Sequence, residues 1–112
     1  RPLRQFIYAD DLAKLIIWTI DNYDDSEPLI LSPDESGEIS IKEVAETIAE
    51  AFNIKDRIQF ETHEADGQYR KTVDNSKLKR IFNEGPLQFT EFKDGISETI
   101  KWFCENYENA RT

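Results

Sequence analysis

The chain has 112 residues, a formal net charge of −9 and a hydrophobic content of 38%. This length suits one domain or a piece of one. The negative charge argues against a protein that binds nucleic acid through a general basic field. The longest apolar run, Leu15–Trp18, is far shorter than the roughly 20 residues that a membrane-spanning helix needs. No secretory signal peptide is visible either.

The sequence contains one cysteine, Cys104, and one histidine, His63. A single cysteine cannot form an intramolecular disulfide, and the two residues are too few for a zinc cluster. We therefore expect no metal site in this chain. The lack of a disulfide favours a reducing compartment, and we expect a cytoplasmic protein.

The first predicted elements are a strand and a helix that meet at a pair of acids. Phe6–Tyr8 favours a strand, and apolar residues recur at helical spacing from Leu12 to about Tyr23. Asp10 and Asp11 stand where carboxylates cap a helix N-terminus. A domain rarely begins with such a junction, so we expect the chain to start partway through a larger protein.

The middle of the chain predicts a strand, a helix and a second strand. Leu29–Ser32 reads as a short buried strand, and Arg57–Glu61 alternates polar and apolar residues. Between them, Ser40 and Glu43 form a capping box ahead of an apolar stripe that runs to Phe52. This order suggests a βαβ unit with parallel strands and a right-handed crossover.

Two more helices complete the predicted architecture. A short one follows a cap at Asp74 or Asn75, and a longer one follows a cap at Thr90 and extends to about Tyr107. We find no repeat and no linker. The sequence therefore predicts a small α/β unit of about four helices and three or four short strands, residues 1–112 forming one region.

Several catalytic arrangements are missing from the sequence. The four glycines lie too far apart for a phosphate-binding loop, which excludes a dinucleotide-binding βα turn. The sequence has no Gly-x-Ser-x-Gly nucleophile elbow to accompany His63. We therefore predict no catalytic residue, no cofactor site and no catalysis by this chain alone.

Two polar clusters remain as candidates for ligand binding. Arg4 can clamp a phosphate through its planar guanidinium. The segment Asp66-Gly67-Gln68-Tyr69-Arg70-Lys71 follows a predicted strand, where ligands of α/β folds usually lie. Its Asp66 can accept hydrogen bonds from sugar hydroxyls. Residue types alone favour a surface cation at Arg4 and a tight turn at Asp66-Gly67.

The order of several motifs favours ligand binding at these two clusters over a surface cation and a simple turn. Arg4-Gln5-Phe6-Ile7-Tyr8 followed by Asp11-Leu12-Ala13 resembles the start of the C-terminal substrate-binding region of extended short-chain dehydrogenase/reductases. With the Asp66–Lys71 loop, Asn75-Ser76-Lys77-Leu78 and the closing Trp102-Phe103-x-x-Asn106-Tyr107, the whole chain resembles the GDP-L-fucose synthase family.

The resemblance implies both an activity and a division of labour. Members of that family convert GDP-4-keto-6-deoxy-D-mannose to GDP-L-fucose by epimerising carbons 3 and 5 and reducing the 4-keto group with NADPH. A Rossmann domain that this sequence lacks carries cofactor, chemistry and the dimer contacts of a homodimer. The resemblance assigns Arg4 to the pyrophosphate and Asp66 to the nucleotide side of a GDP-sugar. Arg70 and Lys71 share the motif and stay open between ligand contact and solvated charge.

Two alternatives stay open at this point. The chain can be the C-terminal region of another nucleotide-sugar epimerase or dehydratase. It can also be a non-catalytic acidic module whose helical faces dock a protein partner, in which case it should fold without help and show no affinity for nucleotides.

Overall fold

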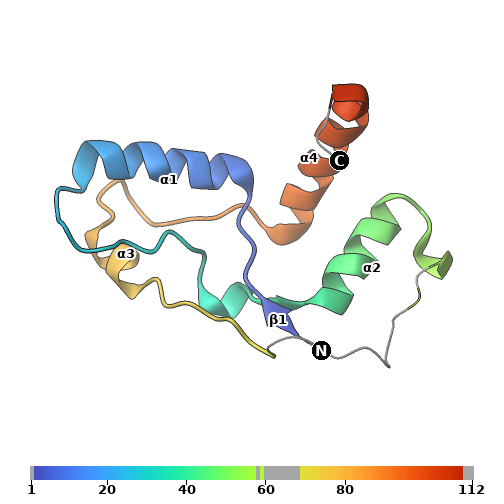
Figure 1. The fold of residues 1–112 in the computed structure, drawn as a ribbon, viewed down its shortest axis with the longest axis horizontal. Helices are drawn as coiled ribbons and strands as arrows, with labels where there is room; N and C mark the ends of the chain where they lie inside the picture. The colour runs from blue at the N-terminus through green and yellow to red at the C-terminus, as the bar shows by residue number, and fades with distance from the viewer. Residues whose placement is uncertain (1, 58, 60–68, 110–112) are drawn as a thin grey trace.

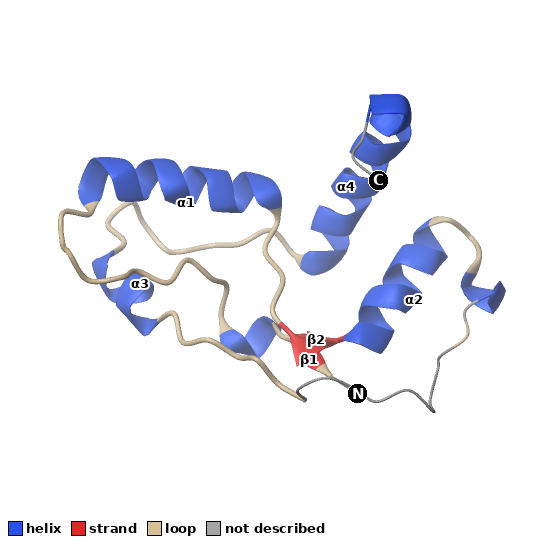
Figure 2. Cartoon of the chain, in the orientation of Figure 1, coloured by secondary structure: helices blue, strands red, loops and turns tan. Residues whose placement is uncertain are grey.

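The computed structural model describes residues 2–57, 59 and 69–109 of the chain. The described part contains two short strands and four α-helices, with single turns of 3₁₀ helix in two connections and directly after the last α-helix (Figure 2). These elements are β1 (Leu3–Arg4), α1 (Ala9–Asn22), β2 (Ile39–Ser40), α2 (Ile41–Ala51), α3 (Ser76–Ile81) and α4 (Phe92–Asn106). The predicted α/β class with four helices is confirmed. No helix in the described ranges is both long enough and apolar enough to cross a membrane.

Strand β1 lies between two other segments of the chain. On one side it pairs antiparallel with β2, so that Leu3 faces Ser40 and Arg4 faces Ile39. On its other side Leu3 forms a parallel bridge with Arg70. The predicted βαβ unit with parallel strands is wrong, because its first strand, Leu29–Ser32, does not form, and the short strand that does precede α2 runs antiparallel to β1.

Both strands predicted from apolar runs before residue 33 are wrong. Phe6–Tyr8 and Leu29–Ser32 belong to no strand, because neither run pairs with a described neighbour. Leu29 and Leu31 are instead held by side-chain packing against the core. The predicted strand at Arg57–Glu61 begins in a 3₁₀ turn, Lys55–Arg57, and its residues 58, 60 and 61 lie outside the described residues.

Helix α2 begins as its sequence predicts. The Ser40 hydroxyl accepts a hydrogen bond from the Glu43 N–H at 3.1 Å, and the Glu43 carboxylate accepts one from the Ser40 N–H at 3.3 Å. This reciprocal pair satisfies two N–H groups that a helix start leaves without intrahelical partners. The helix also has an apolar stripe, of which Ala49 is buried while Ile41 and Phe52 stay exposed, and α2 contacts α4.

The first turns of α1 and α4 differ in detail from the predicted caps. Tyr8 is the N-cap of α1 and Glu91 that of α4, and neither makes a side-chain capping bond. Asp10 and Asp11 lie inside the first turn of α1, where their charge still complements the helix dipole. The Asp11 carboxylate instead accepts hydrogen bonds from Thr90.

The helices form two groups joined through β1 (Figure 1). In one group, Leu15 and Trp18 of α1 pack with Leu78 of α3, which is completely buried. The Trp18 indole N–H donates to the Asn83 side chain at 2.9 Å, so this buried tryptophan has its polar group satisfied. In the other group α2 contacts α4. The site described next lies at the junction, around β1.

The chain is more open than a self-contained domain of its length. Its radius of gyration is 16.6 Å, whereas a compact domain of this size has about 13 Å. Large apolar side chains are also exposed, among them Ile17 at 61% and Ile20 at 76% on the outer face of α1. The described residues therefore leave an extended apolar surface that this chain does not itself cover.

Candidate functional site

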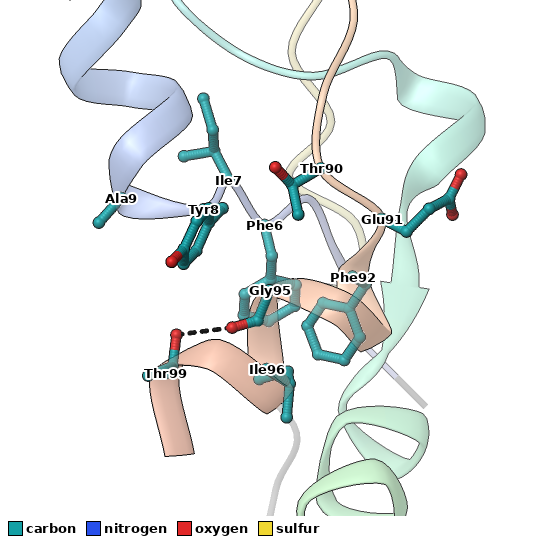
Figure 3. A pocket seen from close by; sticks show the side chains of 10 residues that line it. All are labelled: Phe6, Ile7, Tyr8, Ala9, Thr90, Glu91, Phe92, Gly95, Ile96 and Thr99. Atoms are coloured by element: carbon teal, nitrogen blue, oxygen red, sulfur yellow. Dashed lines mark hydrogen bonds between the residues drawn. The ribbon is translucent and has the colours of Figure 1, made fainter. Parts of the chain in front are cut away.

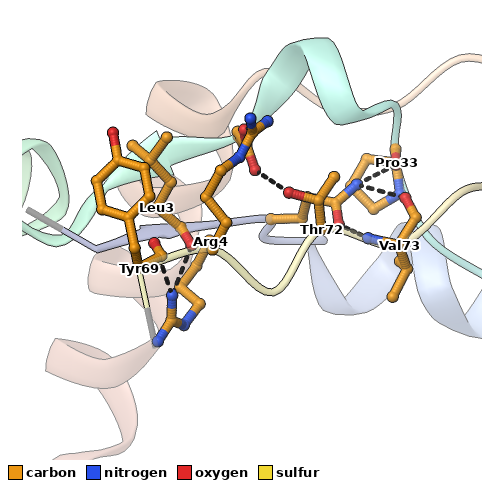
Figure 4. A network of polar contacts seen from close by, with 9 residues as sticks. Leu3, Arg4, Pro33, Tyr69, Thr72 and Val73 are labelled. Carbon is orange, nitrogen blue, oxygen red and sulfur yellow. Dashed lines mark hydrogen bonds and ion pairs between the residues drawn. The ribbon is translucent and has the colours of Figure 1, made fainter. Parts of the chain in front are cut away.

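The structure brings Arg4 beside Tyr69–Lys71, the described part of the second predicted polar cluster, although 65 residues separate Arg4 from Tyr69 in sequence. The Leu3 N–H donates to the Tyr69 carbonyl oxygen at 2.7 Å. The Arg4 guanidinium also reaches this carbonyl, because its Nη1 donates to Leu3 O at 2.7 Å and to Tyr69 O at 3.4 Å (Figure 4). Arg4 is thereby held beside the segment that carries Arg70 and Lys71.

A second attachment is made by the side chain of Gln5. Its Oε1 accepts a hydrogen bond from the Val73 N–H at 2.8 Å. Its Nε2 donates to the carbonyl oxygens of Pro33 at 3.0 Å and Val73 at 3.3 Å (Figure 4). One amide thus joins three segments of backbone. Sequence reasoning noted Gln5 only as part of a motif, because nothing local reveals a partner 68 residues away.

Glu38 fixes the same segment from the other side. Its two carboxylate oxygens accept hydrogen bonds from Thr72 Oγ1, at 2.6 Å, and from the Arg70 guanidinium. The bond from Thr72 is the larger cause, and the bond and charge of Arg70 add to it, so that the pKa of Glu38 lies below its ordinary value of 4.5. The Glu38 side chain is only 8% exposed. This ion pair assigns Arg70 a structural partner that the sequence did not predict.

The four predicted binding residues therefore have different surroundings. Arg4 and Lys71 lie on the two neighbouring segments, and Arg70 is engaged by Glu38. Lys71 is exposed, and its ammonium has no hydrogen bond or ion pair with any residue that the structure describes. Asp66 lies outside the described residues, so its assignment stays a prediction.

Further polar contacts hold the chain that follows this segment. Buried Asn75 donates through Nδ2 to Ser32 O at 2.9 Å and to the Asp34 carboxylate at 3.2 Å. Lys79 forms an ion pair with Asp34 at 2.9 Å. The bond from Lys79, followed by that from Asn75, lowers the pKa of Asp34 below its ordinary value of 3.8. Acidic residues between 34 and 38 thus secure the segment from Arg70 to α3.

Two cavities lined by described residues lie near β1, and neither of these linings contains a lysine or an arginine. The smaller, of about 230 Å³, lies between the start of α1 and the start of α4 (Figure 3). Within it, burial and then the nearby Asp10, Glu98 and Asp11 carboxylates raise the pKa of Tyr8. The larger, of about 390 Å³, is bordered by carboxylates, including Glu38 and Glu91. Carboxylates therefore border both cavities, and neither lining contains a lysine or arginine that could pair with an anionic ligand.

Comparisons with known proteins were made over the same chain. A scan against protein-family models gives no match. The chain is 50% identical over 111 residues to the GDP-L-fucose synthase of Dictyostelium discoideum and 46% identical over 110 residues to a Drosophila melanogaster protein named "Probable GDP-L-fucose synthase". These alignments cover 99% and 98% of this chain and 34% of each relative.

A solved structure of a GDP-L-fucose synthetase is also similar to this chain. The crystal structure of a GDP-L-fucose synthetase from Naegleria fowleri bound to NADP superposes with a TM-score of 0.92 at 47% identity, over 99% of this chain and 34% of that one. The fold is thus that of the C-terminal part of a longer enzyme. The chain is homologous to the GDP-L-fucose synthases, and it spans about a third of the length of the relatives that it matches.

The NADP of the Naegleria structure raises the question of whether this chain holds such a group. A dinucleotide phosphate needs a glycine-rich turn at a helix start. Of the described glycines, Gly95 lies within α4 against the Tyr8 side chain, and Gly85 has a φ of +88° in a bend after α3. These residues do not fit a dinucleotide cradle.

Proposed function

We propose that residues 1–112 form the substrate-binding C-terminal region of a GDP-L-fucose synthase. The complete protein converts GDP-4-keto-6-deoxy-D-mannose to GDP-L-fucose by 3,5-epimerisation and NADPH-dependent reduction at carbon 4. A separate Rossmann domain supplies cofactor, catalytic groups and the homodimer contact. This chain supplies one wall of the GDP-sugar cleft.

The observation that carries the proposal is the pairing of Arg4 with the 69–73 segment. Two cations distant in sequence, Arg4 and Lys71, lie on neighbouring segments at one edge of β1. A pyrophosphate has oxygens to accept from both, and a guanidinium can donate two parallel bonds to one phosphate. Asp66 is the proposed acceptor on the nucleotide side. Arg70 contributes mainly through Glu38, because that carboxylate already engages its guanidinium.

The distribution of charge supports an anionic ligand at this edge. The chain has a net charge of −9, which repels a phosphorylated ligand at long range. Yet five of its 14 lysines and arginines lie within residues 70–80, at Arg70, Lys71, Lys77, Lys79 and Arg80. Lys77 and Lys79 are engaged by Tyr23 and Asp34. Because Lys77, Lys79 and Arg80 lie in α3 and Arg70 is paired with Glu38, the cations that can offset this field at the edge of β1 are Arg4 and the exposed Lys71.

The interaction-module alternative is less well supported. It predicts a self-sufficient fold, whereas the radius of gyration and the exposed side chains Ile17 and Ile20 indicate an incomplete apolar surface. A binding region that works against another domain accounts for both features. The remote GDP contacts would then orient the sugar ring toward catalytic groups carried elsewhere.

Nucleotide selectivity tests the proposal. Calorimetric titrations of GDP, UDP and dTDP into the natural protein that carries these 112 residues should show GDP binding at least about tenfold tighter than the other two. Equal or tighter binding of UDP or dTDP would favour another nucleotide-sugar epimerase or dehydratase. Absence of binding to all three would favour an interaction module.

A second assay tests the proposed division of labour. The 112-residue chain alone should not oxidise NADPH in the presence of GDP-4-keto-6-deoxy-D-mannose, because it contains no proposed catalytic residue. The complete protein should do so under the same conditions. NADPH oxidation by the isolated chain above the rate of a boiled sample would contradict the proposal.

A further inference from the structure

We infer that Gln5 is a positioning residue of the GDP-sugar site, which acts by holding the 69–73 segment in register with β1 and so sets where Lys71 lies relative to Arg4. This inference rests on the proposed function, because it concerns the same pyrophosphate contact. Gln5 itself is not a proposed ligand.

The two segments are joined at two points that bracket the cations. At the first point, Leu3 N–H donates to Tyr69 O at 2.7 Å. At the second, the Gln5 amide exchanges two hydrogen bonds with the main chain of Val73, at 2.8 and 3.3 Å. Leu3 and Gln5 flank Arg4, and Tyr69 and Val73 flank Lys71. The Gln5 bonds thus join the two segments on the far side of Arg4 and Lys71 from the Leu3–Tyr69 bond.

Register matters at this edge because side chains in extended backbone alternate between faces. A slip of one residue would move Lys71 to the opposite face of its segment. Glu38 holds Arg70 and Thr72 to the 34–38 stretch, whereas the Gln5 bonds tie Val73 directly to the chain that continues from β1. Only Thr72 lies between Lys71 and Val73, which in extended chain are about 7 Å apart, so an anchor at Val73 restricts the lysine closely.

The chemistry of an uncharged amide suits this task. Arg4, Arg70 and Lys71 repel one another, and the hydrogen bonds between the two segments must hold these cations together before an anion binds. The Gln5 side chain donates to two carbonyls and accepts from one N–H without adding charge. It also fastens both segments to Pro33, which connects them with the 34–38 stretch that holds Arg70. Cations placed in advance lose less entropy when the pyrophosphate binds.

The test compares GDP with guanosine, which lacks the phosphates. Gln5→Met preserves length and removes all three hydrogen bonds, and Gln88→Met is the matched control because Gln88 is exposed. In the natural protein, Gln5→Met should weaken GDP binding about tenfold and leave guanosine affinity unchanged. In a Lys71→Ala background the same change should weaken GDP less than about twofold, because the residue through which Gln5 acts is gone.

The outcomes separate the two hypotheses. If the unaltered protein does not bind GDP, the proposed function and this inference both fail. If it binds GDP and Gln5→Met leaves the ratio of GDP to guanosine affinity unchanged, only the inference fails. An equal loss for both ligands would also overturn it, because Gln5 would then be merely structural. Should Gln5→Met not fold by circular dichroism, Gln5→Asn, which shortens the side chain and adds no charge, decides by the same ratio.

Discussion

The Asp11 carboxylate accepts two hydrogen bonds from Thr90, one from its N–H at 2.7 Å and one from its hydroxyl at 3.0 Å. Asp11 lies in the first turn of α1, and Thr90 lies two residues before α4 begins. The pair therefore joins the starts of two helices that belong to different groups in the fold. Thr90 also lines the cavity between the two helix starts.

Removing this link should loosen the attachment of α4 to α1. Asp11→Ala and Thr90→Ala should each lower the free energy of unfolding by about 1 kcal/mol. The double variant should lose less than the sum of the two, because both substitutions break the same contact. Urea unfolding of the four proteins in the cycle measures the coupling. Strict additivity would show that Asp11 and Thr90 do not stabilise one another.

Leu78 should be the most sensitive apolar position in the described part of the chain. Its side chain is completely buried between α1 and α3. Leu78→Ala should destabilise the protein by about 2–5 kcal/mol, through lost burial and the cavity left behind. Ile20→Ala is the control, since Ile20 is 76% exposed. Equal effects of the two substitutions in urea unfolding would contradict this description of the core.

The capping box predicts a smaller, local effect at α2. Ser40→Ala removes the acceptor for the Glu43 N–H and should cost about 1 kcal/mol. Ser40→Asp, which restores an acceptor and adds charge at the helix N-terminus, should recover most of this loss. Thermal unfolding monitored at 222 nm measures both. No recovery with Asp would show that the Ser40 hydroxyl has another role.

Acid should release the segment that carries Lys71. The pKa values of Glu38 and Asp34 both lie below their ordinary values of 4.5 and 3.8, because hydrogen bonds to Thr72 and Lys79 favour the charged forms. Their contribution to stability is complete above those ordinary values and declines as the pH falls through the lower folded values. Unfolding free energy measured from pH 6 to pH 3 should therefore fall below about pH 4.5.

Glu38→Gln provides the control for this pH dependence. The variant should be less stable than the unaltered protein at pH 6 and should lose less stability on acidification, because one titrating group is gone. Identical slopes for the two proteins below pH 4.5 would show that Glu38 does not contribute.

Local signals in the sequence predicted the helices well, and nonlocal pairing was harder to predict. The Ser40 and Glu43 capping box and the apolar stripe of α2 act within a few residues, so the sequence alone defines them. The Leu29–Ser32 run has the composition of a strand, yet a strand also needs a backbone partner, which a single sequence does not identify. Apolar packing on the core determines its place instead.

In the candidate site, too, residues in local motifs could be predicted, and partners distant in sequence could not. Arg4 and Lys71 were selected from motifs and a family resemblance, and the structure places their segments side by side. Glu38 was missed because its bond to Arg70 spans 32 residues and a Glu in an acidic chain carries no distinguishing signal. Opposite charges identify a pair only once the fold brings them together.

The most direct test of the account is the GDP affinity of the natural protein with Arg4→Ala, Lys71→Ala and the charge-matched control Lys101→Ala, whose side chain is exposed on α4. Calorimetry should show GDP binding weakened at least about tenfold by each of the first two changes, which is about 1.4 kcal/mol, and less than about twofold by the third. Equal GDP affinities in all three variants and the unaltered protein would contradict a pyrophosphate site at this edge of β1.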